Sequence, residues 1–412
     1  MHGHFSTRRL LVGLTAMVVL AGCAAGPTAA PSSTTSAPAS TAPVATATPA
    51  ATPAASPSSP SPWDEPSDAA LPVATVSTLQ ATLDGLVSGG EVIGLSAAVV
   101  SPEGSWAGAA GVDAAGRAIG PNSAVSIASA SKTFVAAEIL LLASQEKINL
   151  DAPATQYVTL PFEANGATIR QLATMTSGFP GVPDQALNEQ VPKDLARAWT
   201  AEEIVALAKD QPRVGTLGGP GKYNGINYYV LGMVVEKVTG EPLATVLRRD
   251  LLAPAALDRI WMQVAEQPQP PLTVAVDRTD GKVVDPASGY LPSLASASTG
   301  QGGAGMAADA PSLARWGYLL YGGRIIDPDV VATMTDGVPD DDTGYVFGTM
   351  VANWEGETVV GHMGDYIQYS SILLVWPSTR TAVVVLAPVE GMSVSGTLPD
   401  CALSLYRQLL GG

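Results

Sequence analysis

The chain has few cysteines and few histidines, and this scarcity excludes several kinds of site. Among its 412 residues there are 2 Cys, namely Cys23 and Cys401, and 3 His. Two cysteines cannot form a disulfide framework or a cysteine-based zinc site. His2 and His4 stand at the start of the chain, which leaves His362 as the only histidine after the leader. A histidine-rich metal centre is therefore excluded, and any histidine-based triad would have to use His362.

Basic residues are also scarce. The chain carries 21 Lys and Arg against 37 Asp and Glu, which gives a formal net charge of −16 at pH 7. This balance argues against nucleic acid as a partner and against a basic membrane-binding surface.

The N-terminus predicts export. Arg8 and Arg9 precede an apolar run over residues 10–21, which is short for a membrane span and typical of a signal peptide over residues 1–22. The sequence LAGC at residues 20–23 resembles the lipobox of bacterial lipoproteins, which implies cleavage before Cys23 and lipid attachment to its thiol. An ordinary signal peptide with an incidental cysteine is the alternative, and both the Sec and the twin-arginine export routes fit. We expect an extracytoplasmic protein anchored to the cell membrane.

The next segment has almost none of the side chains that a core needs. Residues 24–62 contain only Ala, Pro, Ser, Thr, Gly and Val, without charge or aromatic rings. Such a composition cannot bury enough surface to fold, and its prolines favour extended conformations. We expect residues 23–70 to be a lipidated, disordered tether and residues 71–412 to be the folded domain.

One stretch stands out for chemistry. From Ser129 to Gln145 it is rich in Ala and Leu and has neither Gly nor Pro, which predicts a buried helix. Ser129 and Lys132 share one face of its first turn, at the positive end of the helix dipole. A desolvated lysine there has a lowered pKa and can take the proton of Ser129. The alternative interpretation is a helix cap and a surface lysine.

Two other signals carry less weight. Ser144 and Lys147 repeat the same spacing at the C-terminal end of the helix, where outward carbonyls would repel an oxyanion. Residues 300–305, GQGGAG, fit a nucleotide-binding pattern but follow no predicted strand, so we interpret them as a structural glycine loop.

The order of the remaining patterns predicts an α+β fold. We expect an antiparallel sheet from both chain ends (residues 94–113 and 345–386) and an inserted helical subdomain at about 151–338. The sheet would begin with a hairpin of strands 94–101 and 105–112. The later strands are expected at 345–354, 358–362, 369–376 and 381–386. Helices are expected at 169–175, 201–209, 227–239, 242–252, 311–320 and 396–409.

Several stretches, in this order, resemble the serine β-lactamase and penicillin-binding-protein superfamily, in particular class C β-lactamases, D-alanyl-D-alanine carboxypeptidases and related esterases. The stretches are IASASKTF (127–134), KINLDAP (147–153), TIRQLATMTSG (168–178), YNG (223–225) with the helix after it, and GHMG (361–364). The resemblance covers nearly all of residues 94–410 and implies that family's fold.

The resemblance also implies roles. Ser129 would be the nucleophile, Lys132 its base and Tyr223 a second proton shuttle, while Tyr228 and Tyr229 are expected to be core residues of the following helix. The backbone N–H groups of Ser129 and Asp365 would form the oxyanion hole. His362, Gly364 and Asn224 would complete the substrate site, and no metal or cofactor is needed.

Departures from the family pattern point to the substrate. Gly225 replaces the amide that usually orients a peptide or β-lactam side chain, so Asn224 is the remaining amide there. Met175 stands where the family usually has a histidine. His362 takes the place of a lysine, and we expect it to gain a proton as the pH falls. Asp365 is expected to put a carboxylate beside the oxyanion hole.

These features favour an esterase or amidase over an efficient β-lactamase. The expected substrate is a small ester or amide, or a peptidoglycan-related compound. The alternative is a non-catalytic cell-wall-binding lipoprotein that keeps the fold.

Overall fold

The computed structural model describes residues 61–266, 272–276, 283–284, 293–337 and 343–411. The expected signal peptide, Cys23 and the tether up to residue 60 lie outside these ranges. Within them, no helix is both long enough and apolar enough to cross a membrane.

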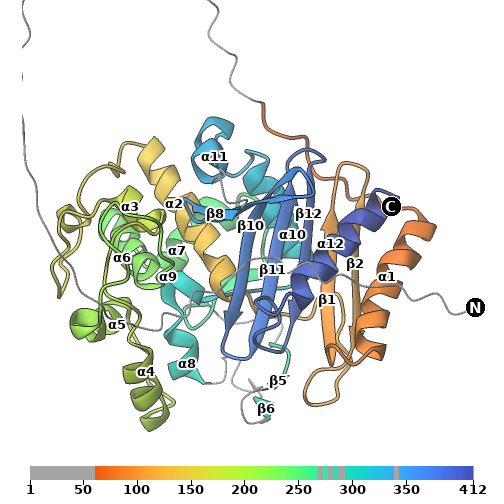
Figure 1. The fold of residues 1–412 in the computed structure, drawn as a ribbon, viewed down its shortest axis with the longest axis horizontal. Helices are drawn as coiled ribbons and strands as arrows, with labels where there is room; N and C mark the ends of the chain where they lie inside the picture. The colour runs from red at the N-terminus through yellow and green to blue at the C-terminus, as the bar shows by residue number, and fades with distance from the viewer. Residues whose placement is uncertain (1–60, 267–271, 277–282, 285–292, 338–342, 412) are drawn as a thin grey trace, which may run out of the picture. The chain divides into compact units, whose positions relative to one another are not determined.

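A seven-stranded antiparallel sheet lies at the centre of the fold (Figure 1). Its strands are β1 (Gly94–Val100), β2 (Ser105–Gly111), β8 (Thr343–Val346), β9 (Thr349–Trp354), β10 (Glu357–Tyr366), β11 (Tyr369–Trp376) and β12 (Thr381–Ala387). The spatial order is β2-β1-β12-β11-β10-β9-β8, so the N-terminal hairpin pairs with the last strand. The prediction of one sheet built from both chain ends is confirmed.

Burial explains the apolar runs of the central strands. β1, β11 and β12 are buried along their whole length, because helices cover both faces of the sheet there. Strands in this position read as continuous hydrophobic runs rather than as alternating ones. β2, at the edge, alternates between half-buried and buried residues.

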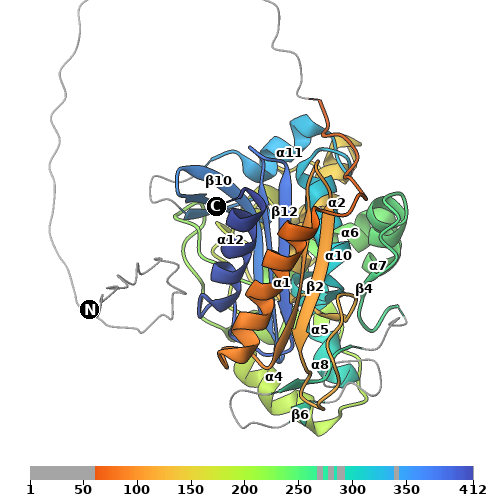
Figure 2. The ribbon, with the colours of Figure 1, turned by 90° about the vertical axis from the view of Figure 1, so that its right-hand side faces the viewer.

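Figure 2 shows the helices on the two faces of the sheet. On one face, α1 (Val73–Ser88) and α12 (Thr397–Leu409) form a core that includes Leu79 and Leu405. On the other face, α10 (Ala310–Tyr321) packs against β1 and β12. The ring of Phe134, from α2 (Lys132–Ser144), stacks on Trp316 of α10 with 3.9 Å between the centroids.

The segment between the two parts of the sheet is mainly helical. Its short strands form a three-stranded sheet in the order β3-β7-β4 and a pair of β5 with β6. Its first elements are β3 (Val125–Ser126), the 3-10 turn η1 (Ala128–Ser131), η2 (Ala154–Gln156), α3 (Ile169–Ala173), α4 (Asp184–Gln190), η3 (Val191–Lys193), α5 (Ala201–Leu207), η4 (Ala208–Asp210) and α6 (Ile226–Thr239). The others are α7 (Leu243–Leu247), the π-helical η5 (Arg248–Leu252), β4 (Ile260–Met262), β5 (Ala275–Val276), β6 (Val283–Val284), α8 (Leu294–Ser298), α9 (Gln301–Ala304), β7 (Met306–Ala308) and α11 (Pro328–Thr335).

Two predicted elements differ from the structure. The strand expected over 345–354 is a hairpin of β8 and β9, and its turn contains Gly348 with φ +75°. A Cβ on Gly348 would lie 2.3 Å from that of Ala136, so glycine allows the turn to reach α2. The helix expected over 242–252 divides into α7 and η5.

Residues 61–70, which the sequence assigns to the tether, pack against the folded domain. The ring of Trp63 lies edge-on to that of Tyr318, with 5.2 Å between ring centroids. The backbone N–H of Trp63 donates to the carbonyl of Gly322 at 2.8 Å. Three acidic residues of this segment pair with arginines of the domain: Asp64 with Arg380, Glu65 with Arg315 and Arg324, and Asp68 with Arg315. The tether prediction is wrong for this segment, because it contains an aromatic ring and carboxylates, side chains that the sequence of residues 24–62 does not include.

We predict that Trp63→Ala destabilises the domain by about 2 kcal/mol, or roughly 3 °C in Tm, because a half-buried ring is lost. Differential scanning calorimetry of a protein that begins at residue 61 would measure the change. Trp63→Phe, which keeps a ring against Tyr318, should lose less than Trp63→Ala. A Tm that is the same for wild type and Trp63→Ala would contradict the packing described for this segment.

Candidate active site

The structure brings the side chains of Ser129 and Lys132 together. Lys132 Nζ lies 2.9 Å from Ser129 Oγ and donates a second hydrogen bond, of 2.7 Å, to the carbonyl of Gly303. Ser129 stands in η1, and the α-helix proper begins only at Lys132. Side chains three residues apart are nearly eclipsed in a 3-10 turn, so this geometry places the amine directly beside the hydroxyl.

The residue before Ser129 is held in an unfavourable backbone conformation. Ala128 is buried and has φ +50°, in the left-handed region, which costs a non-glycine residue about 1 kcal/mol or more. The surrounding hydrogen bonds hold it there. Ser131 Oγ donates to the carbonyl of Ala128 at 2.6 Å, and Ser371 Oγ donates to that of Ile127 at 2.6 Å. The turn that carries Ser129 is therefore fixed from both sides.

Lys132 is buried, and no carboxylate pairs with it among the described residues. Burial lowers the pKa of Lys132 from 10.5 to about 7. Its ammonium nitrogen lies 5.0 Å from the ring centroid of Tyr223 and 5.8 Å from that of Tyr228. Near neutral pH a large fraction of Lys132 is therefore an uncharged amine, which has a lone pair for the proton of Ser129.

Tyr223 brings a second proton-carrying group to the same hydroxyl. Its hydroxyl is near enough to Ser129 for that side chain to lower the pKa of Tyr223, and its ring lies edge-on to Tyr345 with 5.6 Å between centroids. The residue is 47% exposed, so one side of the ring is open to solvent. Burial around the hydroxyl nevertheless raises the pKa of Tyr223 well above its usual value, and Ser129 opposes this only in part. Tyr223 is therefore protonated at neutral pH, whereas Lys132 is able to accept a proton.

His362 lies on β10 and is 1% exposed. Its Nδ1 is 2.5 Å from the carbonyl oxygen of Met363, which can only accept, so Nδ1 carries the proton. Its Nε2 is 3.3 Å from the hydroxyl of Tyr345, which can donate to it. Burial, helped by the nearby charge of Lys132, lowers the pKa of His362 to about 3. The expectation that His362 gains a proton as the pH falls is therefore wrong for neutral and mildly acidic solutions.

Gly364 faces the turn that carries Ser129. A Cβ on Gly364 would lie 2.5 Å from the carbonyl oxygen of Ile127 and 2.9 Å from the Cβ of Ala128. Only glycine allows β10 to approach η1 this closely. His362 faces the same way, because alternate residues of a strand share a face.

Asp365 points to the opposite face of β10. Its carboxylate accepts hydrogen bonds from the hydroxyl of Ser370 and from three backbone N–H groups after β12, those of Gly391, Ser393 and Val394. Burial raises the pKa of Asp365, and these hydrogen bonds oppose the rise. The expected carboxylate beside the oxyanion hole is therefore not found. Asp365 instead organises the segment that leads into α12.

The side chain of Asn224 is directed inward and is unavailable to a substrate. It is 4% exposed and donates to the carbonyls of Phe179 and Pro180, at 3.3 and 2.9 Å. Its amide oxygen accepts from the N–H of Ile226 at 3.2 Å. Met175, in place of the usual histidine, accepts from the backbone N–H of Asn224 through its sulfur at 3.4 Å. The expectation that Asn224 contacts substrate is not supported by this geometry, since all its polar atoms are engaged.

The glycine segment at 300–305 contributes more to the site than its sequence predicts. A Cβ on Gly302 would lie 2.7 Å from the carbonyl oxygen of Tyr228, and one on Gly303 would lie 2.8 Å from the ring of Tyr229. Both tyrosines are buried in α6, as expected. The two glycines let the segment pack against α6, which brings the carbonyl of Gly303 to Lys132. The adjacent glycines were the available signal for this contact.

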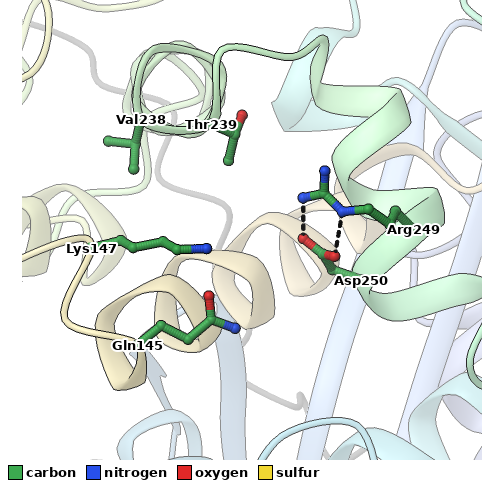
Figure 3. A pocket seen from close by; sticks show the side chains of 6 residues that line it. All are labelled: Gln145, Lys147, Val238, Thr239, Arg249 and Asp250. Atoms are coloured by element: carbon green, nitrogen blue, oxygen red, sulfur yellow. Dashed lines mark hydrogen bonds and ion pairs between the residues drawn. The ribbon is translucent and has the colours of Figure 1, made fainter.

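The second Ser-x-x-Lys pair lies at the other end of α2 and does not form a comparable site. Ser144 Oγ donates to the carbonyl of Leu141 at 2.8 Å. Lys147 instead lines a separate pocket of about 440 Å³, shown in Figure 3, with Gln145, Val238, Thr239, Arg249 and Asp250. None of the residues around Ser129 lines this pocket.

Among the residues that the structure describes, no three His, Cys, Asp or Glu side chains are placed to hold a metal ion. Cys401 is buried and unbonded, and burial raises the pKa of its thiol to about 12.

Comparisons with known proteins agree with this fold. The family described as Beta-lactamase matches residues 79–396. A protein of Bacillus subtilis (strain 168), named as a penicillin-binding protein, PbpX, is 28% identical over 170 residues. That match spans 41% of this chain and 39% of the relative, so less than half of the relative's length is covered.

Solved structures share the fold at low sequence identity. A D-stereospecific amidohydrolase from Streptomyces sp. has a TM-score of 0.69 at 23% identity, over 79% of this chain and 98% of its own. A D-amino acid amidase from Ochrobactrum anthropi SV3, complexed with L-phenylalanine amide, has a TM-score of 0.69 at 22% identity. That match covers 82% of this chain and 99% of the amidase chain. The family match covers most of the folded domain, and the fold agrees with it. The chain therefore belongs to the beta-lactamase family.

Proposed function

We propose that the protein cleaves ester or amide bonds through an acyl-enzyme on Ser129. The 2.9 Å contact between Lys132 Nζ and Ser129 Oγ carries this proposal. It joins a nucleophile to a base whose pKa of about 7 suits neutral conditions. The position of Tyr223 near the same hydroxyl, and its raised pKa, support a role as the proton donor to the leaving group.

The reaction follows from these positions. Ser129 Oγ attacks the substrate carbonyl carbon, its proton passes to Lys132 Nζ, and the carbonyl electron pair moves to oxygen. When the tetrahedral intermediate collapses, the leaving oxygen or nitrogen takes a proton from Tyr223, which Lys132 then reprotonates. Water attacks the acyl-enzyme in the same way and restores the free hydroxyl of Ser129.

The backbone N–H groups of Ser129 and Asp365 would stabilise the oxyanion. The close approach of Gly364 to η1 supports this, because it sets the end of β10 beside the nucleophile. The pairing of β10 with β9 extends only as far as Gly361, so in the described part of the chain no strand covers that edge of residues 362–366. Free N–H donors aimed at the developing charge are worth several kcal/mol of barrier, about 3 for one donor.

Uncharged esters and amides fit this site better than carboxylate-bearing β-lactams. Relatives with a lysine in the third motif have a cation for the substrate carboxylate. Here His362 is neutral, and Lys132 is partly so. The amidohydrolase and amidase of the same fold are named for amide substrates, which supports an amide as one substrate class here.

We also propose that lipid on Cys23 anchors the protein outside the cytoplasmic membrane, through a tether that ends near residue 60. The LAGC sequence at residues 20–23 and the Ala-, Pro-, Ser- and Thr-rich composition after it support this.

Ser129→Ala should abolish hydrolysis of p-nitrophenyl acetate, since it removes the nucleophile. Lys132→Ala and Tyr223→Phe should each lower kcat by about 10²-fold or more, the usual scale for a lost acid or base. Ser144→Ala is the matched control and should keep nearly full activity.

Intact-protein mass spectrometry should show a fluorophosphonate adduct in wild type but not in Ser129→Ala. Equal losses from the two serine substitutions would refute the assignment, and wild type without adduct or turnover would favour a binding protein.

The pH dependence of kcat/KM should reflect the ionisation of Lys132. A base must be unprotonated to accept a proton. The kcat/KM for p-nitrophenyl acetate should therefore be low at pH values below about 7, the pKa of Lys132, and should increase as the pH rises through that value. Lys147→Ala, which removes the control lysine, should leave this profile unchanged.

Nitrocefin, which carries a carboxylate, should react more slowly than the ester at pH 7. It should show no separate gain at pH 5 to 6, where His362 is still neutral because its pKa is about 3. A nitrocefin kcat/KM that equals that of the ester, or a selective rise in acid, would count against this substrate preference.

Cys23→Ser should release the protein from the membrane or leave an unprocessed precursor, while the specific activity of the folded domain is kept. Fractionation of cells followed by an esterase assay would measure both. Wild-type and Cys23→Ser proteins that distribute equally between membrane and soluble fractions would contradict the anchor.

A further inference from the structure

Tyr345 contacts two residues of the site, Tyr223 and His362. Its ring is edge-on to that of Tyr223, with 5.6 Å between centroids and an interplanar angle of 81°. It is also edge-on to the imidazole of His362, at 5.6 Å and 85°. The rings of Tyr223 and His362 are farther apart, at 6.2 Å, and are tilted by 56°. Aromatic rings favour edge-to-face contacts at such separations, so Tyr345 joins the other two rings into one cluster.

The hairpin of β8 and β9, which carries Tyr345, is fixed to three helices around the site. The backbone N–H of Gly348, in its turn, donates to the carbonyl of Ala173 in α3 at 3.3 Å. Gly348 also packs against Ala136 of α2, as described above. A Cβ on Gly348 would lie 2.9 Å from the hydroxyl of Tyr228 in α6, so the turn contacts that helix too. The position of Tyr345 is therefore set by the fold.

Tyr223 needs support of this kind, because its own segment holds only the main chain. It stands in a stretch without helix or strand, and its ring is half-exposed. The backbone N–H groups on either side of it are bonded to Met175, which leaves the side chain free to rotate. Lys132 Nζ lies over the ring, and Tyr345 packs against it. A proton shuttle must be held close to its partners, since a small displacement of a catalytic group lowers the rate strongly.

The hydroxyl of Tyr345 binds His362. It lies 3.3 Å from Nε2, the ring nitrogen without a proton, because Nδ1 donates to the carbonyl of Met363. Within the described part of the chain, Nε2 forms no other hydrogen bond. Loss of the hydroxyl would leave a buried acceptor without a donor, which is unfavourable. The hydroxyl therefore stabilises one tautomer and one orientation of His362.

Resting on the serine-hydrolase function proposed above, we propose that Tyr345 is a positioning residue for this reaction. Its ring holds Tyr223 where the hydroxyl of Tyr223 can protonate the leaving group, and its own hydroxyl holds the neutral imidazole of His362. Tyr345 exchanges no proton with the substrate. It acts through Tyr223, which gives its proton to the leaving oxygen or nitrogen and regains one from Lys132.

A packing role for Tyr345 within the hairpin is the competing explanation. The two explanations differ in one measurable respect. A packing residue changes the folded fraction, which scales the rates of all substrates alike. A residue that positions the proton donor affects most strongly the substrate whose leaving group most needs a proton.

Two acetate esters test the role of the ring. p-Nitrophenolate leaves readily without a proton, whereas the phenolate of phenyl acetate is a poorer leaving group and depends more on an acid. Tyr345→Leu removes the ring, so kcat/KM should fall for both esters and should fall about fivefold further for phenyl acetate. Tyr345→Phe keeps the ring and should leave the ratio of the two kcat/KM values close to that of wild type. A ratio that is the same in wild type and Tyr345→Leu would overturn this role.

The effect on the ratio should depend on Tyr223. In a Tyr223→Phe background the proton donor is already lost, so the addition of Tyr345→Leu should change the ratio by less than about twofold. A change as large as that in the wild-type background would show that Tyr345 does not act through Tyr223.

Tyr321→Phe is the matched control for the hairpin. The hydroxyl of Tyr321 supports the same hairpin through a 3.1 Å hydrogen bond to that of Thr349. Its loss should leave the ratio unchanged, and a shift as large as that of Tyr345→Leu would favour the packing role.

His362 tests the role of the hydroxyl, because a protein that begins at residue 61 contains no other histidine. With isotope-labelled histidine, NMR of wild type at pH 7 should show one neutral tautomer with the proton on Nδ1. In Tyr345→Phe, the Nε2 signal should move toward that of a nitrogen without a hydrogen bond. Identical His362 spectra of wild type and Tyr345→Phe would overturn the role of the hydroxyl.

Two measurements separate this inference from the proposed reaction. If wild type hydrolyses neither ester and forms no fluorophosphonate adduct on Ser129, the hydrolase proposal fails. The contacts of Tyr345 are then decided by the His362 spectra and by Tm. Tyr223→Leu and Tyr345→Leu together should lower Tm by less than the sum of their separate losses, because both remove the same ring contact. Additive losses would refute the contact between the two rings.

Discussion

The site depends on the burial of one amine without a counter-ion. Lys132 is enclosed by aromatic rings and backbone, and burial lowers its pKa to about 7 without compensation from any carboxylate among the described residues. A carboxylate at this place would hold the lysine charged and remove its basicity. The packing of α6, the glycines at 302 and 303 and the strained turn at Ala128 all maintain this dry contact with Ser129.

The fold could be read from the sequence where a pattern has a single physical meaning. The continuous apolar runs of β11 and β12 and the order of the motifs predicted the sheet. Ser129 and Lys132 were found because their spacing coincides with the start of a buried helix. Trp63 was missed, because one aromatic ring at the end of a Pro- and Ala-rich segment gives no periodicity. The role of the carbonyl of Gly303 was also missed, since a backbone atom leaves no residue-type signature.

Asn224 and Asp365 show what the sequence cannot decide, which is the direction in which a side chain points. Both polar groups were expected to face the substrate. Asn224 instead holds the carbonyls of residues 179 and 180, and Asp365 holds the N–H groups of residues 391, 393 and 394. Alternate side chains of a strand point to opposite faces, so the side chain of Asp365 points away from those of His362 and Gly364. This direction could have been predicted if the register of β10 had been known. Each residue shapes a loop that borders the site.

The pairing of β1 with β12 has a consequence for how the protein reaches its native state. Ser96 lies opposite Leu386, so the hairpin of β1 and β2 pairs with a strand that is synthesised much later. Until then, one long apolar edge of that hairpin is unpaired, and the chain cannot close its central core. Contacts so distant along the chain make folding slow and leave the incomplete sheet open to aggregation. Completion of the sheet therefore depends on β12, and loss of that strand would leave the hairpin without its neighbour.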